Sequence, residues 1–375
     1  MMTNFPNKWL KKYNESFKRG LTDITQFHID FGSNDYLGFA KHSILKKIIK
    51  KNFDQLHFQG STGSRLISGN RKFIEEIEHT IAEWHNAEAA IIYPSAYQAN
   101  TGLFSSIADR NDLYLIDENV HASIYDGIRL SYAKHYKFKH NDFKHLKKLI
   151  DKYYSTYHTI YIVIEALYSM DGDSPDITEL LKFIDNKKTF LIVDEAHSFG
   201  VFGEKHLGLF NDKSIAQHCT ARIIGYGKAA GFSGSAIIGS NILKKYLINF
   251  SRSFIYTTAL PLYHYQLIFY LYDEIINQSE LYQKQLQQNI NFFLKQTFSY
   301  TQYSKNPSPI QYIKINACNS SSIQEILYSN NIFAKVILPP TVAAGNERIR
   351  ISLHAFNSES EILQLIQVLN SINNA

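Results

Sequence analysis

The chain has 375 residues, of which 45% are hydrophobic and 19% are charged, so it can bury a large domain and a smaller one and is not disordered. Its net charge of +5 comes from basic residues interleaved with acidic ones, and the lack of a basic block argues against a nucleic-acid-binding protein. Its two cysteines lie far apart, which excludes a disulfide framework and fits a cytoplasmic protein, and no apolar run approaches the ~18 residues that span a bilayer.

The N-terminal part of the chain combines a predicted helix with two polar segments. Four aromatic residues at intervals of four predict a helix that packs on the body or on a partner subunit: Phe5, Trp9, Tyr13 and Phe17. The turn FGSNDYLGFA (31–40) contains Asn34, whose amide could hydrogen-bond a carboxylate. The segment GSTGSRLISGN (60–70) is rich in glycine and serine, so we expect a neighbour or a ligand to shape it.

The central part of the chain alternates strand-like and helical segments. Six short runs are apolar on both faces, as in strands that helices cover on both sides: 89–94, 113–117, 159–166, 189–196, 221–227 and 235–240. Three segments before or between them have helical periodicity: 71–87, 140–154 and 174–186. This alternation predicts a largely parallel sheet with right-handed crossovers.

Small and polar residues follow several of these strands. PSAYQANTG (94–102) follows a strand and opens a helix, where exposed amides can receive a phosphate. The next two such loops place His121 and Ser169 after strands. Each loop alone could be structural, but the carboxyl ends of parallel strands meet at one edge of the sheet. The loops are therefore predicted to converge on one site.

Lys228 is the most informative residue in the chain. It lies among small residues in IIGYGKAAGFSG, just past an apolar strand. Asp194 and His197 lie in VDEAHSFGVFG, at the end of another buried strand. An amine that can form a Schiff base and an acid that can pair with a ring nitrogen are the minimum requirements of a pyridoxal-phosphate (PLP) site.

The pattern changes after Pro261 and predicts a smaller α+β domain. A tyrosine-rich helical stretch (262–298) precedes PIQYIKIN, a helix near Ser321, IFAKVILPP, RIRISLH and a final helix from Ser358. In RIRISLH, strand alternation places Arg348 and Arg350 on the same face.

Three other kinds of site are not supported. VDEAH resembles the acidic box of a helicase, but the glycine and lysine at 227–228 are followed by alanine, so the required phosphate loop is missing. GYGKAAG lacks the third glycine of a dinucleotide-binding loop. The fifteen histidines include no HExxH motif, so no metal site is predicted.

These motifs together resemble the α-oxoamine synthases, which are PLP enzymes of the aspartate-aminotransferase fold (fold type I). SNDYLG, GSTGSRLISGN, HASIYDG, SMDGDSPD, VDEAHSFGVFG, GKAAG, FIYTTALP and PPTVAAGNERIRISL occur in the family's order across nearly the whole chain. The resemblance implies an α/β fold with a large domain, built on a mostly parallel seven-stranded sheet, and a smaller α+β C-terminal domain. We expect an N-terminal segment at 1–45, the PLP-binding domain at 46–260 and the small domain at 261–375.

The resemblance also implies the roles of the residues near the ring. Lys228 would bind PLP through its amine and then act as acid and base at the substrate α-carbon. Asp194 would pair with the pyridine nitrogen, and His197 and Ser169 would bond the phenolic oxygen side. His121 would stack on the ring face.

The phosphate site of the family is altered in this chain. The amides of Ala96 and Tyr97 would meet the phosphate, and Thr257 and Thr258 would reach it from the other subunit of a homodimer. The family usually has glycine in place of Ala96 and threonine in place of Gly225, so the phosphate turn changes slightly and one hydroxyl is lost.

The substrate side has one departure from the family. Asn34 and Arg350 would hold the amino-acid carboxylate, and Thr341 would contact the substrate. Family members use an N-terminal arginine toward the acyl chain, and its position aligns loosely with Lys18 in this chain.

The activity implied is a decarboxylative condensation of L-alanine with a pimeloyl thioester, carried by CoA or an acyl carrier protein. Other α-oxoamine synthases share the catalytic residues: glycine acetyltransferase, 5-aminolevulinate synthase, a serine or cysteate acyltransferase and an autoinducer synthase. A catalytically silent partner subunit is a further alternative, and the intact Lys228, Asp194 and His121 argue against it.

Overall fold

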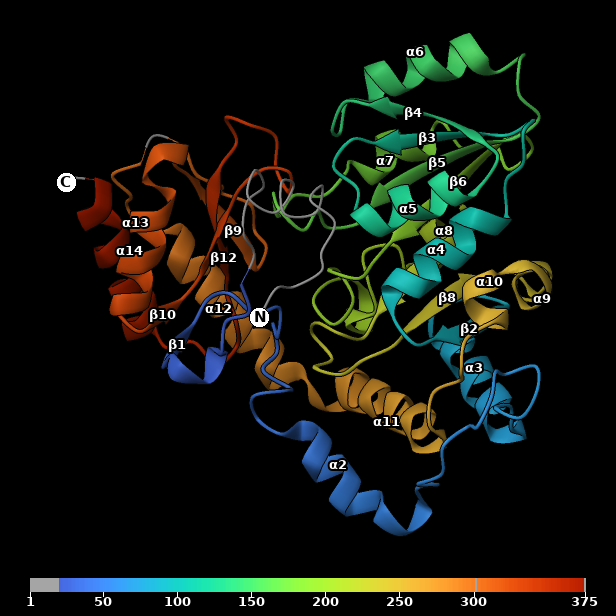
Figure 1. Cartoon of the computed structure of the whole chain (residues 1–375), viewed down its shortest axis with the longest axis horizontal. Coiled ribbons are helices and arrows are strands. Elements are labelled where there is room, and N and C mark those ends of the chain that lie inside the picture. Colours follow the sequence, from blue (N-terminus) through green and yellow to red (C-terminus); the bar gives the residue numbers. More distant parts are fainter. Residues whose placement is uncertain (1–19, 301, 374–375) are drawn as a thin grey trace, which may run out of the picture.

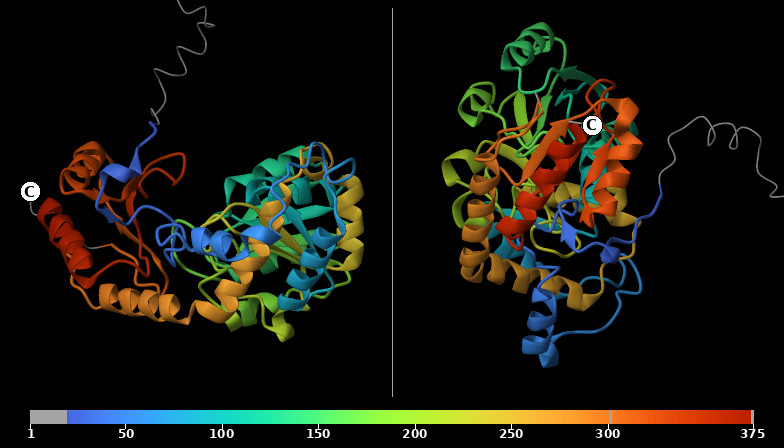
Figure 2. Two further views of the ribbon diagram at one scale, coloured as in Figure 1. Left: turned by 90° about the horizontal axis from the view of Figure 1, so that it is seen from below. Right: turned by 90° about the vertical axis from the view of Figure 1, so that its left-hand side faces the viewer.

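The computed structural model describes residues 20–300 and 302–373, so Lys18 and the predicted aromatic stripe lie outside the described residues. The described chain forms a large domain around a twisted sheet and a smaller domain that carries the C-terminal helix (Figure 1). Helix α11 (Leu262–Gln278) lies against the large domain, and α12 (Glu280–Leu294) continues into the smaller one (Figure 2).

The large domain contains a seven-stranded sheet of order β2-β8-β7-β6-β5-β3-β4, in which only β8 runs antiparallel to the others. Its strands are β2 (Ala89–Tyr93), β3 (Leu113–Asp117), β4 (Lys134–Phe138), β5 (Ile160–Glu165), β6 (Thr189–Asp194), β7 (Cys219–Gly225) and β8 (Ser235–Gly239). The predicted, largely parallel sheet is confirmed. The edge strand β4 has four exposed residues and therefore lacks the apolar pattern that identified the other six.

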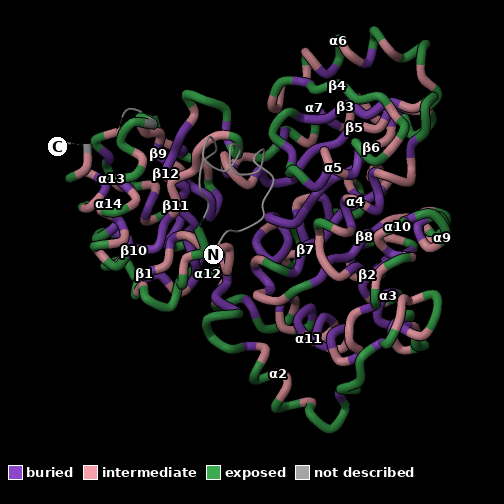
Figure 3. The backbone as a smooth tube through the Cα atoms, in the orientation of Figure 1, coloured by how far each residue is buried: buried purple, intermediate pink, exposed green. Residues whose placement is uncertain are grey.

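Successive residues of the inner strands pack on opposite faces of the sheet. In β3, Tyr114 and Ile116 belong to the hydrophobic cluster that includes α4 (Ala96–Ser106) and α5 (Ala122–Leu130). Leu113 and Leu115 belong to the cluster on the other face, which includes α6 (Phe143–Tyr153). The backbone of these strands is accordingly buried along its length (Figure 3). Burial on both faces explains why the strands are continuous apolar runs.

Most predicted helices are present, with corrected ends. The segments 71–87 and 140–154 form α3 (Lys72–Trp84) and α6, whereas 174–186 yields only the short α7 (Ile177–Leu181). The remaining helices of the large domain and its N-terminal approach are α2 (Ile44–Asn52), α8 (Lys213–Ala216), α9 (Asn241–Phe250) and α10 (Arg252–Ile255). Short 3-10 turns occupy Ile24–Gln26, Phe53–Gln55, Glu204–His206 and Ala317–Asn319.

The small domain has the predicted α+β character. Its antiparallel sheet has the order β11-β12-β9, with β9 (Ile310–Lys314), β11 (Lys335–Ile337) and β12 (Arg348–Ser352). It also contains α13 (Ser320–Ser329), α14 (Glu359–Asn373) and β10 (Ile332–Phe333), which pairs with β1 (Ile29–Asp30) from the N-terminal segment. The single helical stretch predicted over 262–298 is instead two helices that meet at Ser279. Within residues 20–300 and 302–373, no helix has the length and apolar character needed to cross a membrane.

Candidate active site

The loops that follow the parallel strands gather at the carboxyl edge of the large sheet. Asp194 ends β6 and is paired in register with Glu165, which ends β5. Lys228 follows β7, the neighbour of β6 on its other side, which ends at Gly225. The edge that the strand pattern predicts therefore carries two carboxyl groups at the ends of β5 and β6 and a lysine just after the adjacent strand β7.

Lys228 is half-buried, and its charged neighbours are Asp194, Glu165 and Arg350. Burial lowers the pKa of Lys228 to about 8, although the two carboxyl groups act in the opposite direction. Near pH 8, the Lys228 amine is therefore neutral in a large fraction of the molecules. The neutral amine is the form that attacks a carbonyl carbon.

This shift predicts the pH dependence of cofactor attachment to Lys228. Because only the neutral amine reacts, the rate of PLP attachment to cofactor-free protein should rise with pH and level off above about 8. A lysine at the usual value of 10.5 would instead show a rate that still climbs at pH 10. Rapid-mixing absorbance across this pH range distinguishes the two profiles.

Asp194 is buried and held in one orientation. Its Oδ2 accepts a 2.8 Å hydrogen bond from Asn100 Nδ2, and its Oδ1 accepts a 2.9 Å bond from the Ala196 amide. Asn100 Nδ2 also donates to Ser123 Oγ at 2.9 Å. The carboxylate therefore ties together the loop after β6, helix α4 and helix α5, and it can accept a bond from a protonated ring nitrogen.

Glu165 is a site residue that the sequence reasoning missed. It is buried, and its Oε1 has no hydrogen-bond partner among the described residues. Burial, together with the neighbouring Asp194, raises the pKa of Glu165 to about 8, and Lys228 opposes the rise. The signal was present in the sequence, since Glu165 ends a buried strand just as Asp194 does.

The two predicted histidines have different surroundings. His197 is buried, with Nδ1 2.8 Å from the Tyr36 hydroxyl, and burial with nearby Lys228 lowers its pKa well below the usual value. It is therefore neutral at physiological pH. His121 caps the start of α5, where its Nδ1 accepts a 3.2 Å bond from the Ser123 amide. Its side chain is exposed, which leaves the ring accessible for stacking.

Arg350 is a buried cation held by neutral groups. Its Nε donates to the Ser169 carbonyl at 2.6 Å, and its two terminal nitrogens donate to Ser352 Oγ at 2.8 Å and to Asn34 Oδ1 at 3.0 Å. The Tyr36 hydroxyl lies 3.5 Å from a terminal nitrogen of Arg350 and links this arginine to His197. The structure thus brings the predicted Asn34, Ser169 and Arg350 together.

The charges of Arg348 and Arg350 are balanced differently. Arg348 NH1 lies 2.6 Å from Asp171 Oδ1, so a carboxylate neutralises it. No carboxylate of the described residues lies within ion-pair distance of Arg350. An unpaired buried guanidinium is costly, and it is suited to receive a carboxylate ligand.

The predicted phosphate turn lies beside β7. Ala96 and Tyr97 begin α4, and the first amides of a helix have no acceptor within it. A Cβ built on Gly225 would lie 2.9 Å from the Ala196 Cβ and 3.8 Å from the Ala96 Cβ. A side chain at position 225 would therefore crowd Ala196.

Several predicted residues are not joined to this centre by direct contacts. Thr257 Oγ1 lies 3.5 Å from Gln98 Nε2 on the first turn of α4, and Thr258 is exposed beside it. Thr341 is exposed in the turn between β11 and β12. Lys18 lies outside the described residues. Their roles remain predictions.

The sequence model of the family described as Aminotransferase class I and II matches residues 28–369. The chain belongs to this family. A curated relative, 8-amino-7-oxononanoate synthase from Emericella nidulans, is 32% identical over 378 residues, which cover 94% of this chain and 91% of the relative. The crystal structure of 8-amino-7-oxononanoate synthase from Francisella tularensis is 30% identical, with a TM-score of 0.78 over 92% of this chain and 98% of that one.

A serine palmitoyltransferase structure from S. paucimobilis superposes with a TM-score of 0.83 over 92% of this chain and 87% of that one. Its identity is 21%, so this likeness shows the fold alone. Membership of the aminotransferase family and the similarity to these relatives confirm four predictions. They are the resemblance to α-oxoamine synthases, the fold class, the PLP cofactor and the acyltransferase class.

The side chains at the sheet edge of this family member fit PLP. Lys228 offers a partly neutral amine, and Asp194 offers a fixed carboxylate. Two buried oxygens next to them, Glu165 Oε1 and Asn100 Oδ1, have no hydrogen-bond partner among the described residues. Such unsatisfied atoms are expected where a polar group binds.

Proposed function

We propose that this protein condenses L-alanine with a pimeloyl thioester and releases 8-amino-7-oxononanoate, CO2 and the free thiol carrier. The observation that carries the proposal is the buried, unpaired guanidinium of Arg350 in the same site as the partly neutral amine of Lys228. The names of the curated relatives support the choice of substrates.

Each polar side chain has a proposed task. When bound, PLP supplies an electron sink that stabilises negative charge at the substrate α-carbon. Lys228 would hold it and move the proton at that carbon, and Asp194 would keep the pyridine nitrogen protonated. Arg350 and Asn34 would orient the substrate carboxylate.

Neutral groups would hold the rest of the cofactor. His197 and Ser169 would bond the phenolic oxygen, and His121 would cover a ring face. The amides of Ala96 and Tyr97 at the start of α4 would receive the phosphate. Thr341 and Lys18 would contact the substrates.

We also propose a homodimer with shared sites. The loop at 60–70 packs on the segment that contains Thr257 and Thr258, with a 2.9 Å bond from the Ala259 amide to the Gly63 carbonyl. Three large apolar side chains on these two segments are exposed: Leu66, Ile67 and Tyr256. Such a patch is suited to a second copy of the chain that brings its own Thr257 and Thr258 to the phosphate.

The homodimer predicts twice the mass of one chain in analytical ultracentrifugation of the active protein. Ile67→Asp should shift the population toward monomer and lower activity, because it buries a charge in the interface. Lys245→Asp, on the exposed surface of α9, is the control. Full activity in a monomeric peak would contradict the shared site.

The substrate assignment is tested with a panel of amino acids and acyl thioesters, read by release of the thiol. Alanine with pimeloyl-CoA should give the fastest turnover. Faster turnover with serine and a long acyl chain, or with glycine and acetyl-CoA, would assign a different α-oxoamine synthase activity. No thiol release with any pair, despite bound PLP, would indicate a silent subunit.

A further inference from the structure

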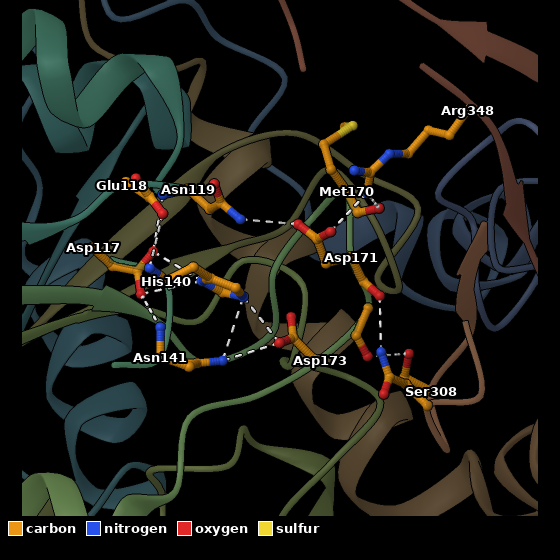
Figure 4. Close-up of polar contacts among 12 residues, drawn as sticks. Asp117, Glu118, Asn119, His140, Asn141, Met170, Asp171, Asp173, Ser308 and Arg348 are labelled. Atoms are coloured by element: carbon orange, nitrogen blue, oxygen red, sulfur yellow. Dashed lines mark hydrogen bonds and ion pairs between the residues drawn. The ribbon is translucent and has the colours of Figure 1, made fainter. Parts of the chain in front are cut away.

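The segment 169–173, which follows β5, is bonded to both domains (Figure 4). It begins at Ser169, whose carbonyl holds Arg350, and it ends at Asp173. Ser169 is itself a predicted cofactor contact, and Arg350 is the predicted carboxylate-binding arginine. The bonds of this segment to each side therefore bear on the geometry of the site.

On the small-domain side, Arg348 of β12 is hydrogen-bonded to this segment. Its NH1 lies 2.6 Å from Asp171 Oδ1 and donates to the Met170 carbonyl at 3.0 Å. Asn306 Nδ2 donates to the Asp171 carbonyl at 2.9 Å, and Ser308 Oγ donates to the Gly172 carbonyl at 2.7 Å. The segment is thus fixed to the sheet that carries both arginines.

Gly172 permits this close approach. Its φ is +70°, a left-handed conformation that favours glycine. A Cβ at this position would lie 2.0 Å from the Ile310 carbonyl oxygen of β9. The backbone of the segment therefore lies directly against the small-domain sheet.

On the large-domain side, the segment is held by carboxylate contacts. Asn119 Nδ2 donates to Asp171 Oδ2 at 3.1 Å. His140 lies between two acids, with Nδ1 3.0 Å from Asp117 Oδ1 and Nε2 2.9 Å from Asp173 Oδ2. The side chain of Asp171 is bonded to both domains, because Arg348 of the small domain binds its Oδ1 and Asn119 of the large domain binds its Oδ2.

His140, Asp171 and Asp173 lie close enough together to suggest a metal site. However, both ring nitrogens of His140 are already bonded to carboxylates. Burial opposes its charge, but the bonds to Asp117 and Asp173 outweigh it and raise the pKa of His140 to about 10. The imidazolium is itself the cation of this cluster.

We propose that Arg348 and Asp171 are positioning residues for amino-acid binding. Their ion pair fixes the 169–173 segment to β12, so that the Ser169 carbonyl holds the Arg350 guanidinium in the orientation that receives the substrate carboxylate. The inference rests on the proposed function, because it takes the ligand of Arg350 to be an amino acid. Arg348 does not touch the substrate in this account and acts through its neighbour on the same strand face.

The test uses PLP-loaded protein and the change in cofactor absorbance on addition of alanine. Asp171→Asn keeps the shape and removes the charge, and Arg348→Met removes the partner. Each should weaken alanine binding on the order of tenfold, since small misplacement of a binding group is costly. The KM for the thioester should stay at its wild-type value, and the affinity for PLP, to which Ser169 adds one of several proposed contacts, should fall much less than the affinity for alanine. Asp151→Asn, which breaks an exposed ion pair with Lys147, is the matched control and should bind alanine normally.

A double variant separates positioning from general loss of structure. If the two residues act as a pair, Asp171→Asn combined with Arg348→Met should bind alanine no more weakly than the worse single variant. Wild-type alanine binding in both single variants, or equal losses for alanine, thioester and PLP, would overturn the proposal. If the cofactor absorbance of the wild type changes with another amino acid and not with alanine, the proposed substrate is wrong. The affinities of the same variants for that amino acid then test the role of the Arg348–Asp171 pair.

Discussion

Replacement of Lys228 by alanine is expected to abolish covalent attachment of PLP and to lower turnover on the order of 100- to 10,000-fold. The loss has two causes, since the amine both holds the cofactor and moves the proton at the α-carbon. Absorbance of the lysine-bound cofactor and thiol release from pimeloyl-CoA measure the two effects separately.

The Lys228→Ala protein should remain folded, because the amine is desolvated and forms no ion pair among the described residues. Its melting temperature without PLP should therefore be close to that of the wild type. Lys245→Ala, an exposed change on α9, serves as the control for loss of a lysine. Undiminished turnover by Lys228→Ala would contradict the assignment of Lys228 as the PLP-binding lysine.

Replacement of Arg350 by lysine is expected to weaken alanine binding by ~1–3 kcal/mol, on the order of 5- to 150-fold, while PLP stays bound. A guanidinium presents parallel donors to a carboxylate, and an ammonium does not. The change also removes the bonds from Arg350 to Ser169 and Asn34, which hold the group in place. The alanine-dependent change in cofactor absorbance gives the dissociation constant.

Arg348→Lys is the matched comparison for this prediction. The new ammonium can still pair with Asp171, so alanine binding should stay nearer to that of the wild type. The opposite order, with normal binding in Arg350→Lys and weak binding in Arg348→Lys, would assign the substrate carboxylate to the other arginine. The sequence alone could not choose between them, because both lie on the same face of β12 and only the structure shows which one is already paired.

The sheet of the large domain could be predicted because each inner strand is buried on both faces. The same rule fails at the edge, where β4 exposes four of its five residues. It fails again at Ser279, where two helices meet without a proline or glycine to mark the break. Local sequence patterns indicate which residues are buried. Neither the exposed strand β4 nor the break between α11 and α12 changes that pattern in a way that the sequence reveals.

The candidate site could be predicted where residues end or closely follow buried strands, as Asp194 and Lys228 do. Glu165 follows the same rule, but a single acid at the end of a buried strand has no sequence feature that separates a site residue from a structural one. Tyr36 was missed for a different reason, since its contacts with His197 and Arg350 join segments far apart in the sequence. Such long-range contacts leave no spacing signal.

The most direct test of the proposed reaction is a single reaction of carboxyl-labelled alanine with pimeloyl-CoA, in which labelled CO2 and free CoA are both measured. The new bond between the alanine α-carbon and the acyl carbon releases the thiol, and loss of the carboxylate releases CO2. We predict one labelled CO2 for each CoA, and none when the thioester is left out. Labelled CO2 without the thioester, or CoA release with the label retained in the amino acid, would contradict the proposed condensation.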